Sequence, residues 1–214
     1  MRDLGPDARR LWDISPPVFP GAPVFPGDQP FVQRWSATLG ADSPVNVAAI
    51  TLSPHVGAHA DAPLHYADGG ASAGELALGP FLGPCRVVHA IGAGPLIRPE
   101  HLAPFEREGW PPRVLVRTCR RTPTAWTDDF AAFDPATIDW LADRGVVLVG
   151  LDTASVDPAR STTLDSHQRL CARDLRVLEN LVLDAVDAGD YELIALPLRL
   201  IGCDASPVRA VLRR

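Results

Sequence analysis

The chain has 214 residues, of which 46% are hydrophobic and 21% are charged, and its net charge is −6. These values are typical of one globular domain, and we expect residues 1–214 to form one. The acidic balance argues against nucleic-acid binding, and no apolar segment approaches the roughly 20 residues that a membrane-spanning helix needs.

Several chemistries are excluded by residues that the chain lacks. All 20 basic residues are arginines, so Schiff-base chemistry on lysine and a lysine-dependent phosphate loop are impossible. A G-x-S-x-G nucleophile motif is also absent, which argues against a serine hydrolase. The four cysteines form no C-x-x-C pair, which predicts reduced, mostly buried thiols. Residues 1–15 lack the apolar core of a secretory signal, so we expect a cytoplasmic protein.

Proline dominates residues 15–30, where Phe19 and Phe25 stand between the prolines. Because proline has no backbone donor for a sheet, we expect an ordered loop whose phenylalanines face a surface or a ligand. Segments typical of strands follow at 31–39, 44–53, 85–91, 113–118, 146–153, 176–180 and 191–198. The glycine-rich segment 67–84 predicts a long ordered loop.

Helices are fewer than strands. The segment 134–145 begins with an Asp-Pro pair and ends in glycine, which are helix start and stop signals. Further helices are expected within 98–109, 165–172 and 181–188. Because strands and helices mix along the chain, the sequence predicts a single α/β domain built on a mixed β-sheet.

The segment HVGAHADAPLH, residues 55–65, holds three of the six histidines. His59 and Asp61 are two residues apart, so both would point the same way from an extended strand. In a fully extended segment, however, His55 and His65 would lie roughly 33 Å apart and could not share a site. We therefore expect the chain to leave a strand near residue 53 and to curl, with Gly57 permitting the turn and residue 63, a proline, stiffening the exit.

Two imidazoles and a carboxylate are ligands that favour Zn²⁺, Mn²⁺ or Fe²⁺ over Ca²⁺ or Mg²⁺. The alternative is a hydrogen-bonded loop that is rich in histidine and binds no metal. A structural zinc site needs four closed protein ligands, whereas here the spare His65 beside the cluster favours an open catalytic site. A metal-binding protein without catalysis remains the alternative of a different class.

Other candidate residues are isolated in the sequence. His167 and Glu179 are weak candidates for metal ligands on their own, and His89 and His101 have surface or structural roles as the simplest interpretation. Asp152 and Asp157 follow a predicted strand in GLDTASVDP, where an ordinary turn is favoured over catalysis.

The histidine stretch resembles a known family. HVGAHADAPLHY is similar to the His-x-Gly-Thr-His-x-Asp-x-Pro-x-His motif of the cyclase-like metal-dependent hydrolases. LWDISPP, PVFPGD, GLDTASVDP, SHQRL and ALPLRLIGCDASPVRAVL extend the resemblance along nearly the whole chain, specifically to the bacterial kynurenine formamidases, or arylformamidases. The resemblance implies a swivelling β/β/α-type fold, a homodimer, and hydrolysis of N-formyl-L-kynurenine to L-kynurenine and formate in tryptophan degradation. A related amide or a cyclic substrate such as isatin is the alternative.

The resemblance also implies a site with two zinc ions, for which Mn²⁺ or another divalent metal is an alternative. The first ion would be bound by His55, His59 and Asp61. Asp61 would bridge to a second ion held by His167 and Glu179, and His65 would be the general acid/base.

The chain departs from the family pattern at two positions. Ala58 replaces the threonine of the motif, at a position that supplies no ligand. Phe25 replaces a tryptophan that forms a wall for the substrate ring, so the apolar face is kept while ring area and the indole N–H are lost.

Overall fold

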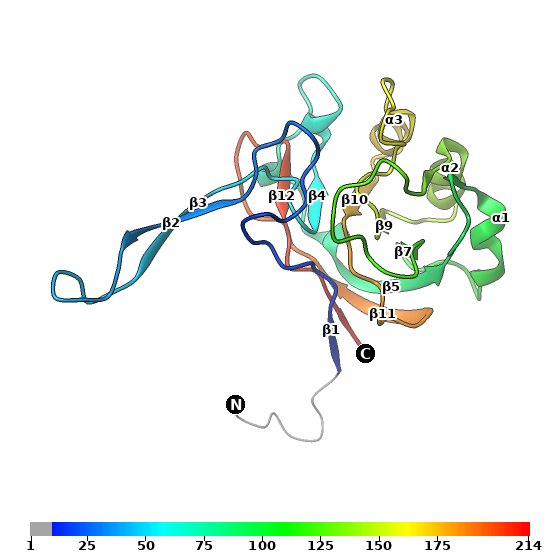
Figure 1. The fold of residues 1–214 in the computed structure, drawn as a ribbon. Coiled ribbons are helices and arrows are strands. Elements are labelled where there is room, and N and C mark those ends of the chain that lie inside the picture. Colours follow the sequence, from blue (N-terminus) through cyan, green and yellow to red (C-terminus); the bar gives the residue numbers. More distant parts are fainter. Residues whose placement is uncertain (1–9) are drawn as a thin grey trace.

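A curled sheet of nine strands forms the centre of the computed structural model, which describes residues 10–214 (Figure 1). In sheet order the strands are β1 (Leu11–Asp13), β13 (Val211–Arg213), β11 (Gly189–Ile194), β5 (Leu82–His89), β7 (Arg113–Arg117), β9 (Leu148–Leu151), β10 (Arg176–Glu179), β4 (His59–Asp61) and β12 (Ala205–Pro207). β5, β7, β9 and β10 are mutually parallel, and the remaining pairs are antiparallel. The predicted α/β class with a mixed sheet is therefore confirmed.

The central strands are buried on both faces. Along β5, Val87 belongs to one apolar cluster and Val88 to the other, and Leu148 and Val149 alternate in the same way along β9. This two-sided burial is why these segments are continuous apolar runs in the sequence.

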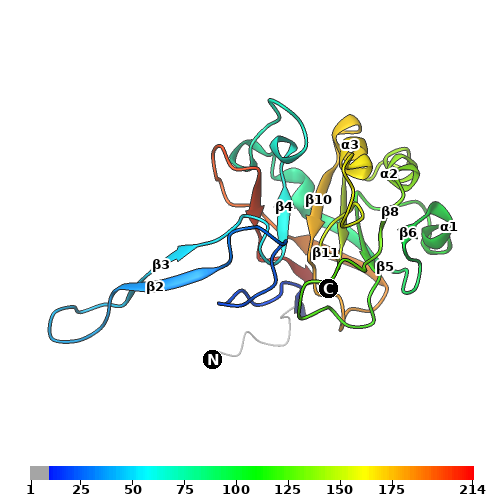
Figure 2. The same ribbon diagram turned by 45° about the horizontal axis from the view of Figure 1, so that its top comes forward.

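Three helices cover one face of the sheet: α1 (Pro99–Leu102), α2 (Pro135–Ala142) and α3 (Asp165–Ala172). They lie together on one side in both ribbon views (Figures 1 and 2), next to the small parallel pair β6 (Leu96–Ile97) and β8 (Ala132–Phe133). In α2, the side chain of Asp134 accepts the backbone N–H of Ala136 at 3.0 Å, which is the cap that the sequence predicts. The helix within 98–109 is only the single turn of α1, followed by a 3₁₀ turn.

The helix expected at 181–188 is absent, and this prediction is wrong. Leu181 and Leu183 are buried two residues apart in an irregular segment. At the start of this segment, the backbone hydrogen bonds go to distant residues and not along a helix. The N–H of residue 181 donates to the carbonyl oxygen of Leu151, and the N–H of residue 182 donates to that of Ile14. Burial against the curled inner face of the sheet therefore overrides the local helical pattern.

Strands β2 (Val32–Ala37) and β3 (Val47–Thr51) form a hairpin that projects from the body in both ribbon views (Figures 1 and 2). Every residue of β3 is exposed, and so is all of β2 except its last residue. Large apolar side chains are exposed on both strands, including Trp35 (57%) and Ile50 (60%).

Other predictions from the sequence are confirmed only in part. The segment 67–84 is an ordered loop with 3₁₀ turns at Ala73–Glu75 and Gly79–Phe81, but its last residues already belong to β5. The cysteines are free, yet only Cys85 is buried and Cys171 is exposed. In residues 10–214 no helix has the length and apolar character to cross a membrane. The prediction that residues 1–15 hold no secretory signal concerns mostly residues 1–9, which lie outside the described part of the chain.

Candidate metal centre

The histidine stretch leaves the β2–β3 hairpin and turns before it enters the sheet at β4. Gly57 lies in this turn with a φ of +67°, and a Cβ atom there would lie 2.7 Å from Cγ2 of Val18. Both the backbone angle and the close approach require glycine. The predicted curl is therefore present, and Pro63 opens the 3₁₀ turn that follows β4.

β4 lies between β10 and β12, and both neighbours run antiparallel to it. His59 is paired with Glu179 of β10, and Asp61 is paired with Ala205 of β12. Residues two apart on a strand share a face, and so do directly opposed residues on neighbouring strands. The side chains of His59, Asp61 and Glu179 therefore project from the same side of the sheet.

His167 reaches this place from the first turn of α3. Asp157 accepts the backbone N–H groups of Ser166 at 2.8 Å and His167 at 3.0 Å, and it also lies 2.7 Å from Nδ1 of the His167 ring. The opposite ring nitrogen, Nε2, then faces Oδ2 of Asp61 at 3.2 Å. Asp157, for which the sequence favours an ordinary turn, instead orients the His167 ring.

Asp61 lies at the centre of the cluster. Its Oδ1 is 3.1 Å from Nδ1 of His55 and 3.3 Å from Nε2 of His59, and its Oδ2 faces His167. Glu179 divides its oxygens similarly, with Oε2 3.3 Å from Nε2 of His59 and Oε1 3.7 Å from Nε2 of His167. Each carboxylate thus turns one oxygen toward His59 and the other toward His167, and Asp61 also faces His55.

The donor set fits a divalent metal. Nε2 of His59 and Oδ1 of Asp61 are buried and have no hydrogen-bond partner, which is a costly state unless another group satisfies them. Ligand atoms that share a tetrahedral ion at about 2.1 Å stand about 3.4 Å apart, close to the separations found here. Ligand atoms of His55, His59 and Asp61 all lie within 4.8 Å of one another. The cluster is therefore able to bind metal.

The electrostatics favour a cation as well. Burial disfavours a charged imidazole, but Asp61 and Glu179 outweigh burial and raise the pKa of His59 to about 10. For His167, burial is likewise outweighed by hydrogen bonds to Asp157 and Asp61, and its pKa is raised to about 10. Burial opposes ionisation of Asp61 too, yet the imidazoles hold its pKa well below the usual value. The carboxylates thus attract positive charge strongly enough to hold protons that a metal would replace.

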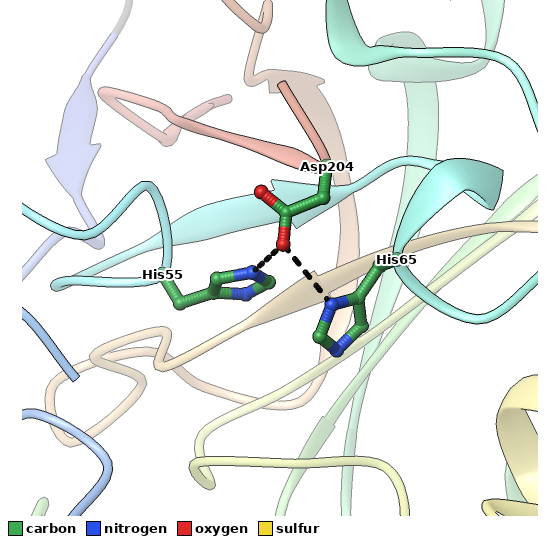
Figure 3. Close-up of side chains that lie close together, drawn as sticks. All are labelled: His55, His65 and Asp204. Atoms are coloured by element: carbon green, nitrogen blue, oxygen red, sulfur yellow. Dashed lines mark hydrogen bonds and ion pairs between the residues drawn. The ribbon is translucent and has the colours of Figure 1, made fainter. Parts of the chain in front are cut away.

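His65 lies on the solvent side of this cluster. Its ring is 4.4 Å from the ring of His55 and 5.7 Å from the ring of His167, measured between centroids. Asp204 lies beside it and contacts both His55 and His65 (Figure 3). All six candidate residues of the metal and acid/base set therefore meet at one place.

A cavity of about 500 Å³ opens over the cluster, with the four histidines and Glu179 in its lining. Phe25 also lines it, and its ring meets Trp126 edge to face at 5.1 Å, while Trp126 contacts Phe130 at 6.4 Å. Phe19 is not part of the lining. Among the described residues that line the cavity there is no arginine, whereas Asp28, Asp152 and Asp204 contribute carboxylates besides Glu179.

The remaining sequence candidates have structural roles. His89 contacts the carbonyl oxygen of Val186, and His101 accepts a backbone N–H at the start of α1. Asp152 is buried and accepts the N–H groups of residues 118 and 119. Sequence reasoning did not single out Trp126 or Asp204. An aromatic residue in a loop was the available signal for Trp126, and Asp204 lies in the segment ALPLRLIGCDASPVRAVL, which carries the family resemblance.

Comparisons with known proteins agree with this geometry. The family model Cyclase, described as "Putative cyclase", matches residues 12–158. A kynurenine formamidase of Bordetella pertussis is 66% identical over 206 residues, covering 96% of this chain and 98% of that protein. A kynurenine formamidase of Delftia acidovorans is 65% identical over 205 residues, with the same coverage.

Solved structures share the fold. A predicted metal-dependent hydrolase from Bacillus stearothermophilus superposes with a TM-score of 0.80 at 28% identity, covering 96% of this chain and 98% of that one. Isatin hydrolase A from Labrenzia aggregata has a TM-score of 0.80 at 24% identity, covering 96% and 94%. At that identity the likeness to isatin hydrolase concerns the fold alone.

Proposed function

The chain belongs to the Cyclase family, and we propose that it is a metal-dependent hydrolase that converts N-formyl-L-kynurenine and water into L-kynurenine and formate. The name of the relative that is 66% identical supports the substrate. One structural observation supports the chemistry: the buried Asp61 turns one oxygen toward His55 and His59 and the other toward His167, while His65 lies beside them on the solvent side. Such a constellation serves metal-assisted hydrolysis of an amide.

We assign the metal ligands as follows. His55, His59 and Asp61 would hold a first zinc ion, and Asp61, His167 and Glu179 would hold a second. Mn²⁺ is the alternative metal, since imidazole and carboxylate ligands accept both. When bound, the metal supplies Lewis acidity, which lowers the pKa of water toward about 7 and polarises a carbonyl oxygen.

His65 supplies the proton chemistry. Amide hydrolysis adds a hydroxyl group to the formyl carbon and breaks its bond to the aryl nitrogen, which needs a proton to leave as the neutral amine. His65 takes the proton that water gives up and delivers it to this nitrogen. General acid/base catalysis of this kind typically contributes about 10²–10⁴-fold to the rate.

The cavity supplies the substrate site. Phe25 and Trp126 present an apolar wall for the aminobenzoyl ring, because their rings already pack edge to face in the lining. Aromatic contacts of this kind contribute about 0.5–1.5 kcal/mol beyond area burial.

The test is release of L-kynurenine from N-formyl-L-kynurenine, followed by absorbance, with isatin as the competing substrate. The purified protein is compared with a chelator-treated sample to which zinc is added back. We expect turnover that chelation abolishes and zinc restores, and little hydrolysis of isatin. No turnover by the metal-loaded protein would overturn the proposed substrate, and turnover insensitive to chelation would overturn the metal dependence.

The number of metals has a separate test. Elemental analysis of the zinc-loaded protein after gel filtration should give two equivalents per chain. One equivalent would refute the binuclear assignment without affecting the substrate.

A homodimer and a cytoplasmic location complete the proposal. The β2–β3 hairpin supports the dimer, since an isolated two-stranded hairpin is marginally stable in water and this one exposes Trp35 and Ile50. A second copy of the chain would cover these side chains.

A further inference from the structure

Backbone contacts place Asp204 next to His65, the proposed acid/base. It immediately precedes β12, and its carbonyl oxygen accepts the N–H of Ala62 at 2.8 Å. Since β12 pairs with β4 through Ala205 and Asp61, the main chain at Asp204 is fixed to the strand that carries two of the proposed metal ligands. Its side chain consequently lies over the cluster, where one oxygen contacts both His55 and His65 (Figure 3).

One oxygen of Asp204 serves two imidazoles. Oδ2 is 2.9 Å from Nε2 of His55 and 3.3 Å from Nδ1 of His65. A carboxylate only accepts hydrogen bonds, so each of these ring nitrogens must carry the proton. Those two protons in turn determine what the other nitrogen of each ring can do.

In each ring, the nitrogen that does not contact Asp204 is the one available for function. With Nε2–H donated to Asp204, Nδ1 of His55 is the ring nitrogen that would offer its lone pair to a metal, and this atom lies 3.1 Å from Oδ1 of Asp61. With Nδ1–H donated to the same oxygen, Nε2 of His65 is the nitrogen left to exchange a proton with a substrate. A carboxylate that hydrogen-bonds a histidine in this way fixes both tautomer and ring orientation.

We propose that Asp204 is a positioning residue that sets the tautomer and orientation of His65, and of His55 beside it, so that Nε2 of His65 serves as the acid/base. The proposal rests on the proposed function, because it assumes that His65 moves the proton. One part of the proposal does not depend on that function, because the Nδ1–H tautomer of His65 is a property of the protein without substrate.

The arrangement has a consequence for substitution. Asp204→Asn keeps the shape and replaces the other oxygen by an NH₂ group, so the oxygen that contacts both rings loses its negative charge. Loss of such a partner typically costs about 10- to 100-fold in activity or metal affinity. With zinc in excess, the effect on His55 is compensated by mass action and the effect on His65 remains.

The experiment compares Asp204→Asn and Asp204→Ala with the wild type at saturating zinc. The matched control is Asp143→Asn, which makes the same chemical change at an exposed ion pair with Arg173 at the end of α2. Each protein is assayed on N-formyl-L-kynurenine and on 4-nitrophenyl formate, whose leaving group departs without a proton. We expect kcat for the amide to fall about 10- to 100-fold in the Asp204 variants, KM to change less than about twofold, and the ester rate to fall far less than the amide rate. A merely structural disturbance would lower both rates together, and that result would overturn the proposal.

Two further readouts do not depend on the amide substrate. Nitrogen chemical shifts of the imidazoles in the metal-free protein, with His65 assigned through a His65→Gln variant, should show the Nδ1–H form of His65 in the wild type and a mixture in both Asp204 variants. In addition, the double variant His65→Ala/Asp204→Asn should hydrolyse the amide no more slowly than His65→Ala alone, because residues that act through one another are not additive.

The outcomes separate the two proposals. An unchanged tautomer, or additive losses in the double variant, would overturn the role of Asp204. Loss of one zinc equivalent from Asp204→Asn in excess zinc would overturn it as well, since Asp204 would then be a ligand. If the wild type fails to hydrolyse N-formyl-L-kynurenine while the tautomer shift is observed, the proposed substrate fails and the positioning of His65 stands.

Discussion

Glu179 on β10 and His59 on β4 lie directly opposite each other, and Oε2 of Glu179 is 3.3 Å from Nε2 of His59. The antiparallel register of the two strands holds this pair, so these two proposed metal ligands lie on rigid elements of the sheet. Sites built on strands keep their geometry better than sites on loops. Substitution of one ligand should therefore remove metal without unfolding the protein.

Asp61→Ala is expected to lose both metal equivalents, because one of its oxygens faces His55 and His59 and the other faces His167. His59→Ala is expected to lose the first equivalent. Turnover should fall by at least about 10³-fold in each, since Lewis-acid stabilisation is worth several kcal/mol. Elemental analysis measures the metal content and circular dichroism shows that the variants are folded, with Asp143→Ala at the exposed end of α2 as control. Full metal occupancy in both variants would refute the ligand roles.

The sequence predicted a large part of this site, and the reason differs between its members. His55, His59 and Asp61 are close in the chain, so residue types and spacing indicate them directly. His167 and Glu179 are far away and were raised to ligands only by resemblance. Asp204 depends on the pairing of β12 with β4, and long-range strand register has no local signature.

The fold shows the same division. The central strands were predictable because burial on both faces makes them continuous apolar runs, and α2 was predictable because Asp134 caps it. The segment 181–188 was misassigned because its buried leucines pack against the sheet in an irregular conformation. Tertiary packing decided that segment, and no pattern within it could show this.

His65→Ala should keep both metals and lose most of its turnover of the amide. The expected loss is about 10²–10⁴-fold, the usual contribution of a general acid/base. The control is His101→Ala, a histidine that only caps the start of α1. Steady-state kinetics and metal analysis on the same samples test this, and a near-normal rate in His65→Ala would end its assignment as acid/base.

Phe25→Ala should weaken substrate binding without slowing the chemical step. Loss of an aromatic contact worth about 0.5–1.5 kcal/mol corresponds to about a two- to tenfold rise in KM, with kcat unchanged because the contact is made equally in ground and transition states. Phe19→Ala is the matched control, since both rings are 51% exposed in the same loop and only Phe25 lines the cavity. Equal effects of the two substitutions on KM would contradict a substrate wall at Phe25.

Gly57→Ala should destabilise the protein through two separable causes. A left-handed conformation costs an L-residue about 1–2 kcal/mol, and the new methyl group would lie 2.7 Å from Cγ2 of Val18. Urea unfolding measures the free energy of unfolding of Gly57→Ala, Val18→Ala and the double variant. Removal of the Val18 methyls should restore the part due to the clash and leave the backbone part. A double variant no more stable than expected from the two single changes would show that the clash contributes nothing.

The exposed β2–β3 hairpin gives the last prediction, which concerns assembly. Trp35 and Ile50 lie on opposite strands of an arm that projects away from the body (Figure 2), and exposed apolar area of this kind marks interaction surfaces. The wild type should sediment at about twice the chain mass of 23.0 kDa, whereas the double variant Trp35→Asp/Ile50→Asp should sediment as a monomer, because two buried unpaired charges would oppose association. Ile91→Asp, an equally drastic change at an exposed residue outside the hairpin, should leave the mass unchanged. A wild-type monomer would refute the homodimer. A variant that stays dimeric would refute the hairpin as its interface, and circular dichroism of the same samples would establish that the variant chain is folded when its mass is read.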